Sequence, residues 1–282
     1  MEFFVGGMRG SLPAAGSEFV DFGGQTTSFL VVGSSGELVV IDAGSGLRVV
    51  ETRLSGGELR VLLLLTHFHL DHLIGLPGFG PLYAEDAEVS VWGPELGAWT
   101  PRRVLGRLLA DPFWPVPAEK LRGLHSVESL RAEERPDALK WGSLRIAWCS
   151  LHHPGGSVAY RIEEPESGSA LVVATDLEWR LSSEKERLEL LELIRTPRTA
   201  QLLVFDANYT AQSYPSYRGW GHSTLEDALE VAQQTGVEEL VITHLGFEKD
   251  DRELSALEER LRRSFPRSAI ARTGMSLNLP AA

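Results

Sequence analysis

The chain has 282 residues, a net charge of −12 and 43% hydrophobic residues. This length and apolar content suffice for a sizeable core, and we interpret residues 1–282 as a single α/β domain. An acidic surface disfavours long RNA or DNA as a ligand and leaves small anionic molecules as candidates. No apolar run approaches a membrane span, and no cleavable leader begins the chain. With one cysteine, Cys149, we expect a cytoplasmic protein with no membrane partner; a homo-oligomer stays open.

The first elements predicted are two paired strands, residues 19–32 and 36–41, joined by a turn at 33–35. A glycine-rich loop beginning at Asp42 follows, and then a short helix over residues 47–54. Asp42 has two interpretations. It either begins an ordinary turn or supports a neighbouring loop of functional side chains.

The most informative stretch is Thr66–His72, which follows the apolar run Val61–Leu65. It contains His67, His69, Asp71 and His72. Three imidazoles and a carboxylate so close together would be costly to bury unless a cation organised them. Because the group has no thiolate, zinc is the first candidate, with manganese or iron as alternatives.

Residues 99–139 interrupt the strand-and-turn rhythm. A helix is predicted from Pro101 to Ala110, and a proline-rich stretch with Phe113 and Trp114 follows it. This excursion is a candidate lid over a metal cleft, and the alternative is a surface excursion that buries its own aromatic side chains. His125 is expected to be a solvated histidine.

Further ligand-type side chains follow apolar runs later in the chain. His152 and His153 follow residues 144–149, Asp176 follows residues 171–175, and His244 follows residues 240–243. Functional groups commonly gather where strands end, because loops converge there on a rigid base. Side chains alternate at a strand end, so only one of His152 and His153 can face such a site easily.

Three amphipathic segments, residues 181–195, 225–235 and 254–263, are predicted to be helices that cover the sheets. The second begins within the sequence Ser223-Thr224-Leu225-Glu226, which has the spacing of a capping box with Ser223 as the cap. The exposed amides of such a helix start could also bind a phosphate.

The ordered series His-x-His-x-Asp-His, then His153, Asp176 and His244, resembles the metallo-β-lactamase superfamily. The resemblance spans most of the chain and implies a four-layer αββα sandwich of two mixed sheets with outer helices. It implies two metal ions, one held by His67, His69 and His153 and the other by Asp71, His72 and His244, with Asp176 bridging both. It also selects His153, in His153-Pro154-Gly155-Gly156, over His152.

One branch of the superfamily is indicated by two further motifs. Gly221-His222-Ser223-Thr224 and the stretch around Asp206 resemble the extra histidine and its acidic partner in the ribonuclease Z and phosphodiesterase branch. Ribonuclease Z itself is disfavoured, because its usual acidic partner is a glutamate and no long glycine- and proline-rich arm is present.

The resemblance predicts a dinuclear metal-dependent hydrolase. Two cations would share a water and lower its pKa, so that hydroxide attacks a phosphorus or carbonyl centre. Asp71, His222 and Asp206 are the expected catalytic residues, with Asp206 orienting His222 for proton donation or oxyanion stabilisation. The leading prediction is a phosphodiesterase acting on a small nucleotide-like or other phosphodiester. A thioester or lactone hydrolase, a tRNA 3′-processing endonuclease and a non-catalytic metal-binding protein remain alternatives.

Overall fold

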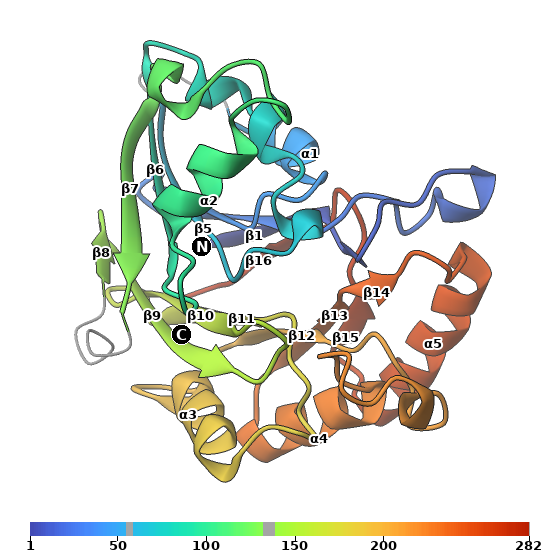
Figure 1. The fold of residues 1–282 in the computed structure, drawn as a ribbon. Coiled ribbons are helices and arrows are strands. Elements are labelled where there is room, and N and C mark those ends of the chain that lie inside the picture. The colour runs from blue at the N-terminus through green and yellow to red at the C-terminus, as the bar shows by residue number, and fades with distance from the viewer. Residues whose placement is uncertain (55–58, 132–138, 282) are drawn as a thin grey trace.

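Two mixed β-sheets pack face to face in the computed structural model, which describes residues 1–54, 59–131 and 139–281. Each sheet has seven strands in this part of the chain. Helices cover the outer face of each sheet, so the layers run helix, sheet, sheet, helix (Figure 1). This is the four-layer α/β sandwich that the sequence predicts. No helix in the described residues is long and apolar enough to cross a membrane.

The first sheet is built mainly from the first half of the chain. Its strand order is β16 (Ser276–Asn278), β1 (Glu2–Gly7), β3 (Ser28–Val32), β4 (Leu38–Ile41), β5 (Leu59–Leu64), β6 (Ala87–Pro94) and β7 (Leu124–Leu130). Its covering helices are α1 (Leu47–Glu51) and α2 (Pro101–Leu108). The strands from β4 to β7 run parallel, so their carboxyl ends lie at one edge of the sheet.

The second sheet continues the same plan in the second half of the chain. Its strand order is β15 (Ser268–Ile270), β13 (Glu239–Thr243), β12 (Leu202–Asp206), β11 (Ser169–Ala174), β10 (Ser157–Glu164), β9 (Leu144–Leu151) and β8 (Leu139–Trp141). Its covering helices are α3 (Glu184–Arg195), α4 (Leu225–Thr235) and α5 (Asp251–Ser264). A short parallel pair, β2 (Arg9–Gly10) with β14 (Leu245–Gly246), joins the two halves beside the ends of the strands.

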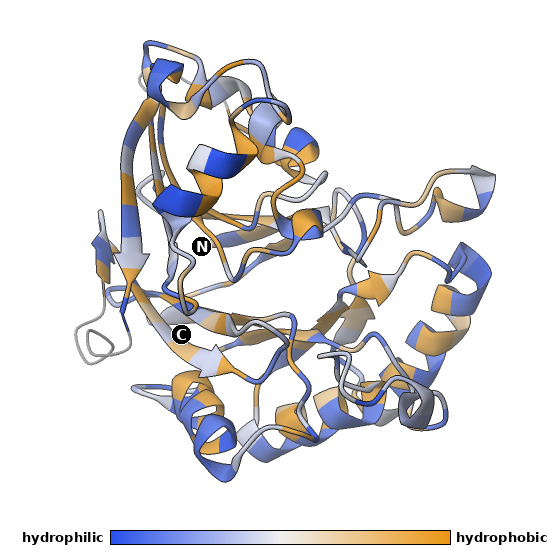
Figure 2. Cartoon of the chain, in the orientation of Figure 1, coloured by the Kyte–Doolittle hydropathy of each residue, from blue (hydrophilic) through white to orange (hydrophobic). Residues whose placement is uncertain are grey.

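The first sheet is buried on both faces, which explains its continuous apolar runs. Along β5, Leu62 and Leu64 belong to the core between the sheets, whereas Leu63 packs in the separate cluster beneath the outer helices. Residues Phe3 and Phe4 of β1 divide in the same way. In Figure 2 the inner strands are mainly coloured hydrophobic, while the edge strand β7 and the covering helices alternate hydrophobic and hydrophilic positions.

Several predicted boundaries were wrong, by between one and nine residues. The strand predicted from residue 19 begins only at Ser28, because the double glycine Gly23-Gly24 interrupts it and residues 17–19 form a 3-10 turn. The helix predicted over 47–54 ends at Glu51. The cap of α4 is Thr224, which forms its capping box with Asp227, so the prediction of Ser223 and Glu226 was displaced by one position.

The excursion at 99–139 is partly woven into the fold. It contributes α2 and the edge strand β7 to the first half of the molecule. Its residues 132–138 lie outside the described residues. Trp114 packs against the outer core and donates its indole N–H to the Tyr83 hydroxyl at 2.9 Å, whereas Phe113 is 74% exposed. Burial therefore explains one of the two aromatic side chains and not the other, and a lid role remains a prediction.

Candidate metal centre

The ligand-type side chains of both halves meet at one edge of the sandwich. The loop after β5 carries His67 and His69, and its short 3-10 turn, Leu70–His72, presents Asp71 and His72. Residues His153, Asp176 and His244 follow the ends of β9, β11 and β13. All seven side chains expected from the sequence are therefore brought together, although they come from segments up to 177 residues apart.

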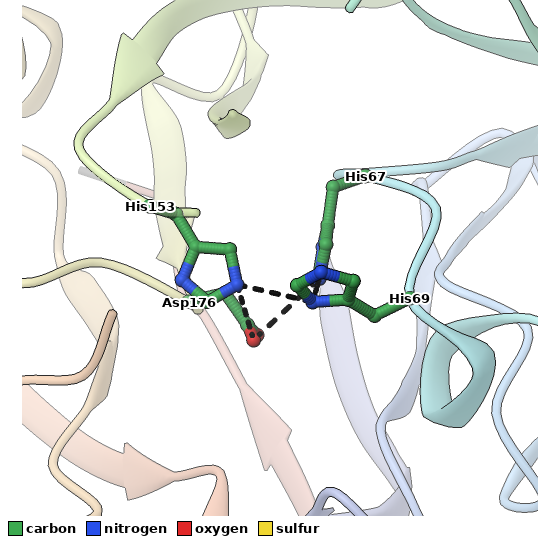
Figure 3. Close-up of side chains that lie close together, drawn as sticks. All are labelled: His67, His69, His153 and Asp176. Carbon is green, nitrogen blue, oxygen red and sulfur yellow. Dashed lines mark hydrogen bonds and ion pairs between the residues drawn. The ribbon is translucent and has the colours of Figure 1, made fainter. Parts of the chain in front are cut away.

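One half of the cluster contains three imidazoles and one carboxylate, shown in Figure 3. The Nδ1 atom of His69 lies 2.9 Å from Nε2 of His67 and 3.1 Å from Nε2 of His153. The Oδ1 atom of Asp176 lies 3.6 Å from each of the same two Nε2 atoms. His69 is the exposed member, so this half opens toward solvent.

The other half is fully buried and contains Asp71, His72 and His244. The Nε2 atoms of the two histidines lie 3.2 Å apart, and Asp71 Oδ2 lies 3.2 Å from that of His244. The Oδ2 atom of Asp176 lies 3.1 Å from His72 Nε2. The Oδ1 atom of Asp176 also lies 3.3 Å from His244 Nε2, so this carboxylate lies between the two halves.

The hydrogen bonds on the outer side of the rings determine which nitrogens carry protons. Asp42 accepts from Nδ1 of His72 at 2.8 Å, and the carbonyl oxygen of Gly221 accepts from Nδ1 of His153 at 2.8 Å. Because these acceptors require a proton on Nδ1, the neutral rings direct the Nε2 lone pair inward. Lone pairs and carboxylate oxygens that converge within about 3 Å repel one another unless a proton or a metal cation lies between them. The donor set therefore fits divalent metal ions that accept nitrogen and oxygen ligands.

The charge balance of the cluster supports the same conclusion. Burial lowers the pKa of His67 well below its usual value and that of His153 to about 4, so both rings favour the neutral form that binds metals. Burial opposes charge on His72 as well, but Asp176 and Asp71 outweigh it and raise its pKa. Burial would raise the pKa of the Asp71 and Asp176 carboxyl groups, but the neighbouring histidines outweigh it and lower both pKa values. The buried half thus attracts positive charge.

Asp42 supports the ligand loop, as one interpretation of the sequence expected. Its side chain is fully buried and accepts from His72, from the backbone N–H of Thr66 at 2.8 Å and from the hydroxyl of Thr66 at 2.8 Å. The Thr66 hydroxyl in turn lies 3.0 Å from Nδ1 of His67. A single carboxylate therefore orients one ring in each half, directly for His72 and through a hydroxyl for His67.

Backbone strain is concentrated at this cluster. In the described residues, positive φ angles outside glycine occur at Ser11, Asp42, Asp176 and His244, with values from 57° to 65°. The last three contribute to the cluster or support it, and the backbone N–H of Ser11 donates to Asp71 at 2.7 Å. Such conformations cost of order 1 kcal/mol or more each and persist where the surroundings enforce them.

His222 and Asp206 lie together beside the cluster, as predicted. The Nδ1 atom of His222 donates to Asp206 at 2.7 Å, which leaves Nε2 as the free ring nitrogen. The ring stacks on His244 at 4.7 Å between centroids. Although burial favours the neutral ring, Asp206 outweighs it and raises the pKa of His222 to about 9. This histidine can therefore hold a proton next to the cluster.

The loop that carries His222 is anchored by Glu178, which the sequence interpretation missed. This buried carboxylate accepts from the Tyr214 hydroxyl at 2.6 Å and from the backbone N–H groups of Gly219 and Gly221, both at 2.8 Å. Gly221 in turn supplies the carbonyl that orients His153. An acidic residue two positions after Asp176, in an otherwise buried segment, was the available signal.

The other side chains singled out in the sequence either lie away from the cluster or are engaged in other hydrogen bonds. His152 is half-buried, with its ring directed toward Glu186 at 3.8 Å, and His125 is exposed on β7. The hydroxyl of Ser223 donates to the Leu177 carbonyl and accepts from the Trp179 N–H. Since Ser223 and Thr224 are fully buried and the Thr224 N–H is bonded to Asp227, the start of α4 is closed to a phosphate, contrary to expectation.

Comparison with known proteins agrees with this fold. Residues 38–245 match the family model of the beta-lactamase superfamily domain. A ribonuclease Z of Streptococcus gordonii is 23% identical over 269 residues, covering 79% of this chain and 84% of that protein. The structure of yeast PDE1 superposes with a TM-score of 0.71 at 18% identity and covers 99% of both chains.

A diphosphatase of the PhnP family superposes with a TM-score of 0.67 at 17% identity, covering 98% of this chain and 96% of that one. The family model spans 208 of the 282 residues, from β4 through the last histidine of the cluster. The chain therefore belongs to the beta-lactamase superfamily, has relatives among the ribonuclease Z proteins, and is a metal-dependent hydrolase.

Proposed function

We propose that the protein hydrolyses a small phosphodiester with the aid of two divalent cations, zinc being the first candidate and manganese or iron the alternatives. The exposed half of the cluster would hold one cation through His67, His69 and His153. The buried half would hold the second through Asp71, His72 and His244. Asp176 would contact both, because its carboxylate oxygens lie near ring nitrogens of both halves.

When bound, the cations would activate a water molecule and offset the negative charge of the phosphate. The side chains of the protein supply the rest of the chemistry. Asp206 holds His222 with Nε2 free, so this ring could donate a proton to the leaving oxygen or stabilise charge on the phosphoryl oxygens. Asp42 and Glu178 act as positioning residues, the first for two ligand rings and the second for the loop of His222.

The observation that carries this proposal is the His222–Asp206 pair beside the cluster. Carbonyl chemistry on a thioester or lactone could proceed with the metal ligands alone, whereas a poor phosphodiester leaving group benefits from a positioned proton donor. The kinship with ribonuclease Z and the likeness to PDE1 support phosphodiester chemistry. A filled, non-catalytic site is disfavoured, because His69 is exposed to solvent.

RNA cleavage is the second candidate, because relatives of this chain are ribonuclease Z proteins. Against it stands the net charge of −12, because polynucleotide affinity depends on basic side chains that pair with phosphates. Metal-loaded protein should therefore hydrolyse bis-(p-nitrophenyl) phosphate more readily than it cleaves a tRNA precursor. Efficient cleavage of the precursor at physiological salt would favour the endonuclease instead.

The deciding experiment removes the His222 ring. His222→Ala should keep both metals and lower kcat on phosphodiesters with poor leaving groups by roughly 10²–10⁴. Most of that loss should disappear with p-nitrophenolate as leaving group, because its oxygen needs no proton. The control is His152→Ala, which removes a half-buried histidine next to His153 in sequence and should leave kcat unchanged.

Two results would contradict the role proposed for His222. A loss of the same size for good and poor leaving groups would assign His222 to charge stabilisation rather than proton donation. Wild-type activity of His222→Ala on every phosphodiester would remove the main reason for preferring this chemistry over thioester or lactone hydrolysis.

A further inference from the structure

A cavity of about 530 Å³ opens beside the exposed half of the metal cluster. His67 and His69 form part of its wall, so a group bound at metals held by this half would extend into the cavity. The volume lies in the range of small-ligand sites. The cavity is therefore positioned to receive one substituent of the substrate.

The remaining wall is almost entirely apolar. Phe68 and Leu70 come from the metal-ligand loop, and Trp99, Leu108 and Phe113 come from α2 and its flanking segments. Gly155 and Gly156, which have positive φ angles of 83° and 86°, contribute a wall without side chains. No carboxylate, amide or hydroxyl side chain lines the cavity in the described part of the chain.

Two aromatic side chains at this cavity are exposed to solvent. Trp99 is 42% exposed and Phe113 is 74% exposed, in contrast to Trp114, which is packed and hydrogen bonded. Large apolar groups beside a cavity are typical of ligand sites. The guanidinium of Arg107 lies 5.4 Å from the centre of the Trp99 ring and, among the described residues, is the one charged group of the wall besides the cluster histidines.

We infer that this cavity binds an apolar, aryl- or alkyl-type ester group of the substrate while the phosphoryl group lies at the metal cluster. The inference rests on the proposed phosphodiesterase function and names its substrate class. A nucleobase fits less well, because its polar edges would lose water without finding partners on this wall. The apolar group instead gains from burial against Phe113 and Leu108.

Binding of phosphonates tests this without any turnover. Metal-loaded protein is titrated by calorimetry with methylphosphonate, phenylphosphonate and thymidine 5′-monophosphate. Phenylphosphonate should bind on the order of tenfold more tightly than methylphosphonate, because only its ring reaches the cavity. The nucleotide should show no comparable gain.

Variants test whether the tighter binding of phenylphosphonate comes from the cavity. Phe113→Ala and Leu108→Ala should each reduce the phenyl-to-methyl affinity ratio by about threefold, leaving methylphosphonate binding unchanged. Phe113 is exposed, so its replacement should not disturb folding. The control is Leu188→Ala on α3, which removes a 58% exposed apolar side chain outside the cavity and should preserve the ratio.

Equal affinities for the two phosphonates in the wild type would overturn the inference. So would a ratio that Phe113→Ala and Leu108→Ala leave unchanged, or tighter binding of the nucleotide than of phenylphosphonate. Failure of the proposed function is distinguishable. A protein that prefers phenylphosphonate through Phe113 yet hydrolyses no phosphodiester retains the apolar pocket and loses only the phosphodiesterase assignment.

Discussion

Replacing Asp42 by asparagine should weaken metal binding although Asp42 is not expected to touch a metal. The substitution keeps the shape of the side chain, and asparagine tolerates the positive φ of 61° at this position. What changes is the acceptor capacity. The carboxylate accepts from the Thr66 N–H, the Thr66 hydroxyl and the His72 ring, whereas an amide must direct an NH₂ group at one of these donors.

The magnitude follows from the lost bond. A hydrogen bond to a charged group contributes about 1.5–3 kcal/mol, and the opposed donors in Asp42→Asn add the cost of an unsatisfied group. We therefore expect the free energy of unfolding to fall by about 3 kcal/mol. Metal affinity should fall by roughly 10–100-fold, mainly in the half that contains His72, because that ring loses its direct partner. His67, reached only through Thr66, should be affected less.

The assay is a competition titration of zinc against a chelator, which resolves a weak and a tight equivalent. In Asp42→Asn one equivalent should weaken far more than the other. Glu258→Gln is the matched control, because Glu258 is also a buried carboxylate that accepts from several donors, including Arg272 and the Ile270 N–H, but belongs to α5. It should lower stability and leave both zinc affinities unchanged. Wild-type zinc binding by Asp42→Asn would refute the orienting role of this carboxylate.

Further predictions concern metal content and acid stability. Metal-loaded protein should carry close to two equivalents by elemental analysis, and Asp176→Ala should lose the most metal, whereas a single tight equivalent under saturating metal would contradict the dinuclear site. His153→Ala should reduce metal content and His152→Ala should not; the reverse pattern would displace the assignment by one residue. Although burial would raise the pKa of Glu164, hydrogen bonds from Ser167 and Ser34 lower this pKa to about 2. The ionised form of Glu164 therefore stabilises the fold above the ordinary pKa of a glutamate. This contribution is lost as pH falls toward 2. Glu164→Gln should therefore lower the free energy of unfolding by about 2–3 kcal/mol at pH 7, with a smaller difference near pH 3 in urea titrations; a difference independent of pH would contradict the ionic role.

The sequence alone was enough for the fold class and for the set of candidate ligands. Four of them, His67, His69, Asp71 and His72, lie within six positions after a buried strand, so local spacing already brings them together. The apolar runs that precede His153, Asp176 and His244 were also visible, because strands buried on both faces leave continuous hydrophobic stretches. That these seven residues bind metal remains a prediction.

Element boundaries were less accessible to sequence because they depend on competing local bonds. Ser223 and Thr224 are both capable N-caps, and each is followed three positions later by an acidic residue. Tertiary contacts decide between them, since the Ser223 hydroxyl is used by Leu177 and Trp179, which leaves Thr224 to cap α4. The choice rests on residues more than 40 positions away.

Other features exist only because distant segments converge. Ser11 donates to Asp71 across 60 positions, and Glu178 anchors a loop about 40 positions further along the chain. The apolar cavity likewise combines Phe68, Phe113 and Gly156 from three separate segments. A sequence pattern reports periodicity and short-range spacing, whereas partner choice and cavity shape depend on how the two sheets and their loops pack. The sequence therefore determined which chemistry is available, and the tertiary structure decided how each group is oriented and what surrounds it.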